Sequence, residues 1–292
     1  MSEPVAICTS VLILVTCVAS YLGFRSPAVE EKYIFCPERI LAGKEYYRLV
    51  TSAFLHGGWG HLVWNMVGLY SFGRALEWSL GKGNFLLVYF GAVVGGNLLS
   101  LYVHRHHEYA AYGASGGVCG VIFAYLLLFP GAGVALYFAL PIPGWLYAIG
   151  FIVGSFVAMK NARDNIGHDA HLGGAIVGLL IAATLEPEAV RDNWRVFVLV
   201  LGPAVLVLIY LWVNPLFLPG ASFSVRPFRA KARATPLPGH NQEAPQVDAI
   251  LEKIARTGLD SLTGEEKALL EEASGKYRRR AESRKPKSGL PI

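Results

Sequence analysis

Long stretches without charged residues limit most strongly how this chain can fold. Apolar stretches of about 18 residues are long enough to cross a hydrocarbon core of roughly 30 Å as helices. Seven candidate spans follow one another at residues 5–24, 61–80, 84–103, 115–130, 134–158 (interrupted by Pro141 and Pro143), 171–185 and 196–213. No water satisfies backbone groups inside a bilayer, so each span must form its own backbone hydrogen bonds. We therefore predict an all-α membrane protein, a bundle of seven helices whose sixth is short.

Composition supports this class, because 53% of the 292 residues are hydrophobic and only 16% are charged. No basic leader precedes the first apolar run, so we expect it to stay in the protein as a span. Three cysteines (Cys8, Cys17 and Cys119) lie inside predicted spans and Cys36 lies in a loop, which predicts no disulfide framework. The sequence indicates no cofactor and no nucleic-acid partner, and it does not indicate an oligomeric state.

The chain changes character after the last span. We divide it into a transmembrane core at 1–190, an additional transmembrane helix at 191–214, a Pro-rich basic linker at 215–246, and a small helical segment with a basic tail at 247–292. In the last segment, Ile250, Leu251 and Ile254 recur at helical spacing, and Thr263 with Glu266 predicts a capping box that begins a second short helix. The basic end is either a solvated tail or a contact with anionic lipid headgroups.

Polar residues stand at the starts of three spans. His61 and Asn65 open the second span, Ser115 in "YGASGGVCG" opens the fourth, and His171 opens the sixth. Consecutive spans alternate in direction, so these three starts lie at one membrane face. His61 and Asn65 are four residues apart and therefore project from one helical face, about 6 Å apart along the axis.

A serine hydroxyl is a weak nucleophile unless a base takes its proton, and histidine is the commonest such base. Ser115 also begins a helix whose first N–H groups lack intrahelical acceptors and suit an oxyanion. His61 and Asn65 offer side-chain donors to the same oxygen. Each residue alone also has a structural interpretation, since a serine in a membrane helix commonly bonds a backbone carbonyl, and a histidine there can serve packing or gating.

Small residues at four-residue spacing predict close approach of the fourth and sixth helices. They are Gly116 and Gly120 after Ser115, and Gly174 and Gly178 after His171. Such packing would bring the serine and the histidine within hydrogen-bonding distance.

Three motifs in this order, "HGGWGHLVWN", "GASGG" and "AHLGGAIVG", resemble the signatures of rhomboid intramembrane serine proteases. The resemblance extends from Tyr47-Arg48, which is similar to an aromatic-Arg pair of the family's first loop, to about residue 185. It implies a rhomboid-like six-helix transmembrane bundle, to which the chain adds a seventh C-terminal span and a short helical tail. The implied activity is serine-type endopeptidase cleavage of transmembrane segments.

The resemblance also assigns roles to residues. It implies Ser115 as nucleophile and His171 as general base, with an oxyanion hole formed by His61, Asn65 and the Ser115 backbone. Supporting positions are Gly113, the first residue of the serine motif, and His56, a further histidine of the first motif. Glu77 in "GRALE" matches a structural acidic position.

One position departs from the family pattern. Active members often carry an aromatic residue four positions after the serine, where its ring stacks on the catalytic imidazole, and this chain has Cys119. Either the imidazole is held less firmly or another ring takes this role. Asp169 is an alternative third member of a triad, but two residues before His171 it would point off the face of that histidine.

A zinc cluster of His56, His61, His168 and His171 is a further alternative, although "HExxH" is absent and no cysteine accompanies these histidines. We therefore predict no metal site. We read "HRHHE" at 104–108 as an interfacial loop.

Three classes of function compete. An active protease needs both Ser115 and His171; an inactive relative that binds and escorts membrane clients would normally lack one; a channel or transporter would show more paired charges within its spans. The expected partners are a transmembrane protein substrate and the lipid bilayer, and the expected location is the cell (inner) membrane, as a multi-pass protein.

We follow the family pattern for the side of the membrane on which the site lies, and we leave the side of the C-terminal tail open. The family pattern places the N-terminus in the cytoplasm and the site toward the outer face, whereas cations in the first loop favour the opposite. These cations are Arg25, Lys32, Arg39, Lys44 and Arg48.

Overall fold

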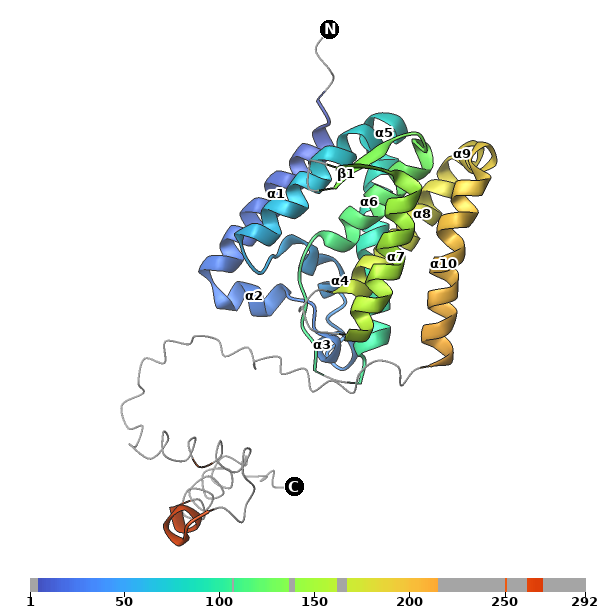
Figure 1. The fold of residues 1–292 in the computed structure, drawn as a ribbon. Helices are drawn as coiled ribbons and strands as arrows, with labels where there is room; N and C mark the ends of the chain where they lie inside the picture. Colours follow the sequence, from blue (N-terminus) through green and yellow to red (C-terminus); the bar gives the residue numbers. More distant parts are fainter. Residues whose placement is uncertain are drawn as a thin grey trace, which may run out of the picture. The chain divides into compact units, whose positions relative to one another are not determined.

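The computed structural model describes residues 5–106, 108–136, 140–161, 167–214, 250 and 262–269. The chain forms two compact units, Met1–Ala230 and Lys231–Ile292. The first unit is largely helical (Figure 1). Its helices are α1 (Ile7–Arg25), α2 (Pro27–Tyr33), α3 (Pro37–Leu41), α4 (Arg48–Thr51), the 3-10 helix η1 (Ser52–Phe54), α5 (Trp59–His104), α6 (Ser115–Leu128), α7 (Gly144–Asn161), α8 (His168–Leu185), α9 (Pro187–Asp192) and α10 (Trp194–Val213).

The long α5 contains the second and third predicted spans, separated at Gly81, whose φ of 79° is not helical. A Cβ built at Gly68 would lie 3.0 Å from Cγ1 of Val118, and one built at Gly117 would lie 2.7 Å from Cγ2 of Val93. Residues 68 and 93 would be roughly 37 Å apart on a straight helix, yet both contact the same turn of α6. The chain therefore turns back at Gly81, as two separate spans require.

A carboxylate of α5 caps the start of α1. Glu77 accepts hydrogen bonds from the backbone N–H groups of Cys8 (2.9 Å) and Thr9 (2.8 Å), and from the Thr9 hydroxyl (2.8 Å). The N-cap residue Ala6 has no side chain that could bond these donors. Glu77 therefore supplies from α5 the cap that α1 lacks, in agreement with the structural role that the resemblance implied.

The prediction of a span over 134–158 was wrong in its first part. Residues there form an antiparallel hairpin of β1 (Gly133–Leu136) and β2 (Leu140–Pro143), and α7 begins only at Gly144. Pro141 and Pro143 have no N–H and occupy alternate positions of β2, so the other positions of that strand can carry the ladder hydrogen bonds. Within the described residues, these two strands are the sheet that departs from an all-α fold.

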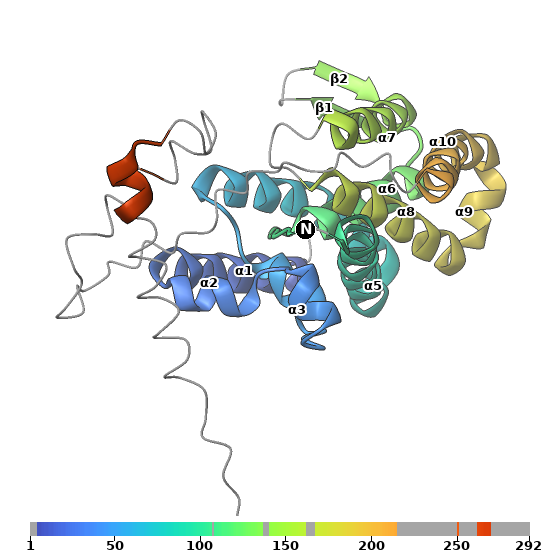
Figure 2. The ribbon, with the colours of Figure 1, turned by 90° about the horizontal axis from the view of Figure 1, so that it is seen from below.

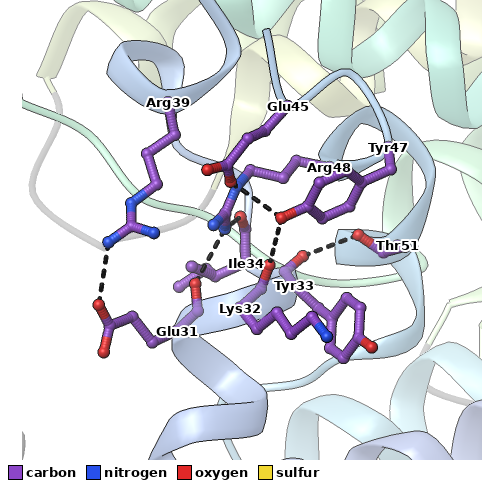
Figure 3. A network of polar contacts seen from close by, with 9 residues as sticks. All are labelled: Glu31, Lys32, Tyr33, Ile34, Arg39, Glu45, Tyr47, Arg48 and Thr51. Atoms are coloured by element: carbon purple, nitrogen blue, oxygen red, sulfur yellow. Dashed lines mark hydrogen bonds and ion pairs between the residues drawn. The ribbon is translucent and has the colours of Figure 1, made fainter. Parts of the chain in front are cut away.

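The first loop is a folded element (Figure 3). The fully buried Arg48 donates to the carbonyl oxygens of Glu31 (2.9 Å) and Ile34 (2.7 Å), and its Nε lies 2.5 Å from the Glu45 carboxylate. Arg39 pairs with Glu31 at 3.0 Å on the surface. These contacts tie α2, α3 and α4 to one another ahead of α5.

The bundle is centred on α5, α6 and α8, which make the most extensive interhelical contacts. Figure 2 shows α6 and α8 between α5 on one side and α7 on the other, with α10 beside α7. Phe156 of α7 and Tyr210 of α10 pack edge to face, with ring centroids 5.3 Å apart. The additional C-terminal helix therefore packs on the core through α7.

Within the part of the chain that the structure describes, four helices are long and apolar enough to cross a membrane: α1, α5, α8 and α10. Shorter apolar helices run over Ser115–Leu128 and Gly144–Met159. A largely helical fold with several apolar helices is thus confirmed, and the six-plus-one count of spans stays a prediction.

In the second unit, Gly264–Leu269 form one helical turn and a half behind the predicted capping box. The N–H of Thr263 donates to the Glu266 carboxylate at 2.8 Å, and the N–H of Glu266 donates to the Thr263 hydroxyl at 3.3 Å. The capping box is therefore confirmed. The predicted linker at 215–246 and, apart from Ile250, the preceding helix lie outside the described residues.

Candidate active site

The serine motif forms a tight turn directly before α6. Gly113 has a φ of 135°, a conformation that favours glycine, and its N–H donates to the Ser52 carbonyl at 3.0 Å. A Cβ there would lie 2.8 Å from Cε1 and 3.0 Å from Nε2 of His61. Glycine is therefore required at this position both for its backbone conformation and for the close approach of the imidazole. Ser115 follows as the first residue of α6.

Ser115 and His171 come together across α6 and α8. The Ser115 hydroxyl oxygen lies 2.7 Å from Nε2 of His171, within hydrogen-bonding distance. His171 belongs to the first turn of α8, and its N–H donates to the Gly167 carbonyl at 3.0 Å. The two predicted dyad residues thus meet at the starts of their helices.

Glycines allow this approach. A Cβ at Gly174 would overlap the backbone of Gly116, and one at Gly178 would overlap the backbone of Gly120. The helices α6 and α8 are therefore in backbone contact along these two turns, which confirms the predicted close packing.

His61 lies beside the serine, whereas Asn65 is bonded to its own helix. A Cβ built at Gly113 would lie 3.0 Å from Nε2 of His61 and 3.6 Å from the Ser115 hydroxyl oxygen, so the two side chains border the same point. Asn65 is buried, and its amide donates to the His61 carbonyl at 3.0 Å. One amide N–H of Asn65 is therefore already occupied, and the second is the one that an oxyanion could use.

His56 joins α1 to the serine motif. The Ser20 hydroxyl donates to the Phe54 carbonyl at 2.9 Å and also lies 2.9 Å from Nδ1 of His56. The single hydroxyl proton of Ser20 is used in the bond to the Phe54 carbonyl, because a carbonyl can only accept. In the bond between Ser20 and His56, Nδ1 of the imidazole is therefore the donor. Its Nε2 then accepts from the Ala114 N–H, 3.4 Å away. Burial, with a smaller effect of His61, lowers the pKa of His56 to about 3, so this neutral tautomer holds the backbone before the nucleophile.

An aromatic ring packs next to the imidazole of His171, and it comes from α7. The ring centroids of Phe151 and His171 are 6.3 Å apart. Phe151 also packs against Phe123 at 5.4 Å, while Cys119 is buried in the adjoining core. The motifs gave no signal for Phe151, because nothing local in "AIGFIVG" distinguishes a phenylalanine facing the site from one facing lipid.

Asp169 is directed to α5. Its carboxylate accepts a short hydrogen bond from the Ser100 hydroxyl and lies 3.2 Å from Nε2 of His104. Both partners come from the last two turns of α5, which disfavours Asp169 as a third triad member. The sequence interpretation of residue 104 as part of an interfacial loop was wrong, because His104 is the last residue of α5 and is bonded to a buried carboxylate.

Among the residues that the structure describes, no three His, Cys, Asp or Glu side chains are grouped so that they could hold a metal ion. Of the imagined zinc cluster, the rings of His56 and His61 meet edge to face at 4.9 Å, and those of His168 and His171 do so at 5.8 Å. The four histidines thus form two separate ring contacts.

Comparison with known proteins finds two family models that match parts of the chain. A family model described as a rhomboid domain matches residues 43–188, and a second, described as a family of unknown function (DUF6576), matches residues 240–276.

Three relatives illustrate the similarity. The rhomboid protein YdcA of Bacillus subtilis is 34% identical over 144 residues, which is 49% of this chain and 68% of that protein. Rhomboid protease GluP of the same species is 34% identical over 151 residues, 50% of this chain and 27% of that protein. Rhomboid protein 1, mitochondrial, of Saccharomyces cerevisiae is 32% identical over 171 residues, 55% of this chain and 49% of that protein. The chain thus spans about half the length of the yeast relative.

Proposed function

The chain belongs to the rhomboid family, and on this premise we propose that it is an intramembrane serine endopeptidase that cleaves transmembrane segments with a Ser115–His171 dyad. The observation that carries the proposal is the 2.7 Å separation of the Ser115 oxygen and Nε2 of His171 at the starts of two packed helices. Nucleophile and base must be within hydrogen-bonding distance for a serine to be activated.

In the proposed reaction, the Ser115 oxygen attacks the carbonyl carbon of the scissile bond while Nε2 of His171 takes its proton. The tetrahedral intermediate collapses when the imidazolium returns that proton to the leaving amine and the C–N bond breaks. A water molecule, deprotonated by the same nitrogen, then hydrolyses the acyl-enzyme and restores the serine.

The start of α6 supplies the proposed oxyanion hole. The first N–H groups of a helix have no acceptor in that helix and lie at the positive end of its dipole. The N–H of Ser115 belongs to this set, and the His61 ring is held beside it over Gly113. Asn65 contributes its second amide N–H in this proposal. Each donor aimed at the oxyanion would stabilise the transition state more than the ground state.

The proposed substrate is a transmembrane helix of another protein. A peptide bond in a helix is shielded by its backbone hydrogen bonds, so a client has to unwind locally, and Gly or Pro near the cut would help.

Family membership and the long apolar helices make the chain a multi-pass integral membrane protein. We propose the cell membrane as its location; the name of the yeast relative places that protein in mitochondria, so fractionation of the source organism decides between the two.

The direct test is cleavage of a labelled model transmembrane substrate by the purified full-length chain in detergent. We expect two products from the wild type and none from Ser115→Ala or His171→Ala. A folded wild type that binds the substrate without cutting it would contradict the proposal and favour the client-escort alternative.

A further inference from the structure

A polar cluster with a buried carboxylate lies at the end of α5, outside the dyad. It consists of Ser100, His104, Tyr109 and Asp169. Asp169 is 4% exposed, and its carboxylate lies 3.2 Å from Nε2 of His104 and accepts a hydrogen bond from the Ser100 hydroxyl. The rings of His104 and Tyr109 are stacked, with centroids 3.6 Å apart and planes 2° from parallel. His104 therefore contacts α8 with its nitrogen and the loop after α5 with its ring face.

These contacts reach both segments that lead to the dyad. Asp169 is two residues before His171, and Tyr109 is six residues before Ser115. Tyr109 also packs edge to face on Phe35 of the first loop, at 6.2 Å. Next to it, Ala111 and Phe35 exchange backbone hydrogen bonds of 2.9 and 3.2 Å. The loop before the serine and the helix that carries the histidine are thus attached to the same cluster.

Close backbone contacts at glycines surround the cluster where α5 packs on α8. A Cβ at Gly96 of α5 would overlap the Ala170 carbonyl, and one at Gly173 of α8 would lie 3.0 Å from the Gly95 carbonyl. Small residues of this kind let two helix backbones approach closely. The hydrogen bonds of the cluster are directional, so they constrain how the end of α5 and the start of α8 are placed relative to each other.

We propose that His104 is a positioning residue for the dyad: through Asp169 and Tyr109 it holds the start of α8 and the loop before α6 in the register that places the Ser115 oxygen against Nε2 of His171. The proposal rests on the proposed protease function. Small misplacements of reacting groups lower rates strongly, on the order of a hundredfold for about 1 Å, so a register contact has a kinetic effect without touching substrate.

The test separates the two contacts of His104 in the full-length chain. His104→Gln keeps an N–H donor and removes the stacking ring; His104→Phe keeps a ring and removes the donor; Asp169→Asn removes the charge with little change of shape. The matched control is His106→Gln, the same chemical change at an exposed residue two positions on. Each protein is titrated with a fluorophosphonate probe, and kcat and KM are measured on the model transmembrane substrate.

A positioning role predicts that the rate constant of Ser115 labelling and kcat fall about tenfold or more. In the His104 and Asp169 variants, the final amplitude of labelling and KM would stay within about twofold of the wild type. The control His106→Gln would match the wild type in all four quantities. A purely structural role would lower the amplitude, because part of the protein is unfolded, and leave the rate constant of the remainder unchanged; that result overturns the proposal. Variants as fast as the control overturn it as well. A wild type that is not labelled at Ser115 overturns the proposed function and this proposal together.

Discussion

At the scale of single residues, the site is defined by neighbours that constrain each reacting group. The Ser115 oxygen contacts His171, while the backbone before the serine is held by His56 and by the Gly113 N–H bond to Ser52. Phe151 packs on the imidazole from α7. Each of these contacts limits the orientation of one partner of the dyad, so their removal should change rates before it unfolds the protein.

Phe151→Ala should lower kcat about two- to tenfold, since an aromatic contact contributes roughly 0.5–1.5 kcal/mol. Cys119 lies one turn after Ser115, so a ring introduced there in the space vacated by Phe151 should restore part of the rate in Cys119→Phe/Phe151→Ala. Phe156→Ala, which removes the ring contact of α7 with Tyr210 of α10, is the matched control and should keep the wild-type kcat. A Phe151→Ala variant as fast as this control would remove Phe151 from the account.

The lowered pKa of His56 predicts that the protein loses stability at acid pH. The folded chain keeps this imidazole neutral down to about pH 3, whereas the unfolded chain takes up the proton near 6.5. The unfolded state therefore binds more protons in this window, and the free energy of unfolding should fall by about 1.4 kcal/mol for each pH unit below 6.5. Unfolding of wild type and His56→Asn, followed in detergent from pH 7.5 to 4.5, checks this; equal pH slopes would speak against it.

At the scale of elements, glycines determine which helices can exchange backbone contacts. Gly116 and Gly120 of α6 meet Gly174 and Gly178 of α8, and this seam brings the two helix starts together. The carboxylate of Glu77 meanwhile attaches α1 to α5. Close approach at glycines thus joins α6 to α8, and capping joins α1 to α5.

Gly174→Ala should separate α6 from α8, because the added methyl would overlap the Gly116 backbone, which cannot rotate away. Overpacking of this kind costs about 1–3 kcal/mol or more, and we expect both a lower thermal midpoint and loss of Ser115 labelling. Gly202→Ala in α10 is the control, since its Cβ would meet nothing within 4 Å. Equal midpoints and equal labelling of the two variants would contradict the close packing of α6 on α8 at these glycines.

At the scale of the whole molecule, the residues of the proposed reaction lie in the first compact unit. Ser115, His171, His61 and Asn65 come from α5, α6 and α8, whereas the second matched family model covers residues 240–276. Arg48 and Arg39 of the first loop are engaged within that loop. The orientation in the membrane stays a prediction.

Deleting all residues after Pro219 should leave cleavage of the model substrate within about twofold of the full chain, because the residues of the proposed reaction all lie in α5, α6 and α8. The segment would then serve regulation, partner binding or localisation. The measurement is kcat/KM of the truncated protein, with its thermal midpoint as the control for folding. Loss of activity in a truncated protein that keeps its midpoint would show that the C-terminal segment completes the enzyme.

Sequence patterns predicted the helical membrane class, the meeting of Ser115 with His171 and the capping box of Thr263, because each follows from spacing along the chain. They missed the hairpin before α7, where apolar composition resembles a span and only Pro141 and Pro143 indicated otherwise. They also missed Phe151 and the bonding of His104 to Asp169. These contacts join residues 20 and 65 positions apart, and their geometry depends on the rotation of packed helices, which no local pattern specifies.

The most direct measurement is labelling of the purified full-length chain with a fluorophosphonate probe, followed by mass spectrometry of the modified peptide. The proposed dyad predicts a single adduct on Ser115, absent in Ser115→Ala and formed much more slowly in His171→Ala, because the hydroxyl 2.7 Å from Nε2 is the activated nucleophile. An adduct on another residue, or equal labelling of Ser115 in His171→Ala, would contradict the dyad.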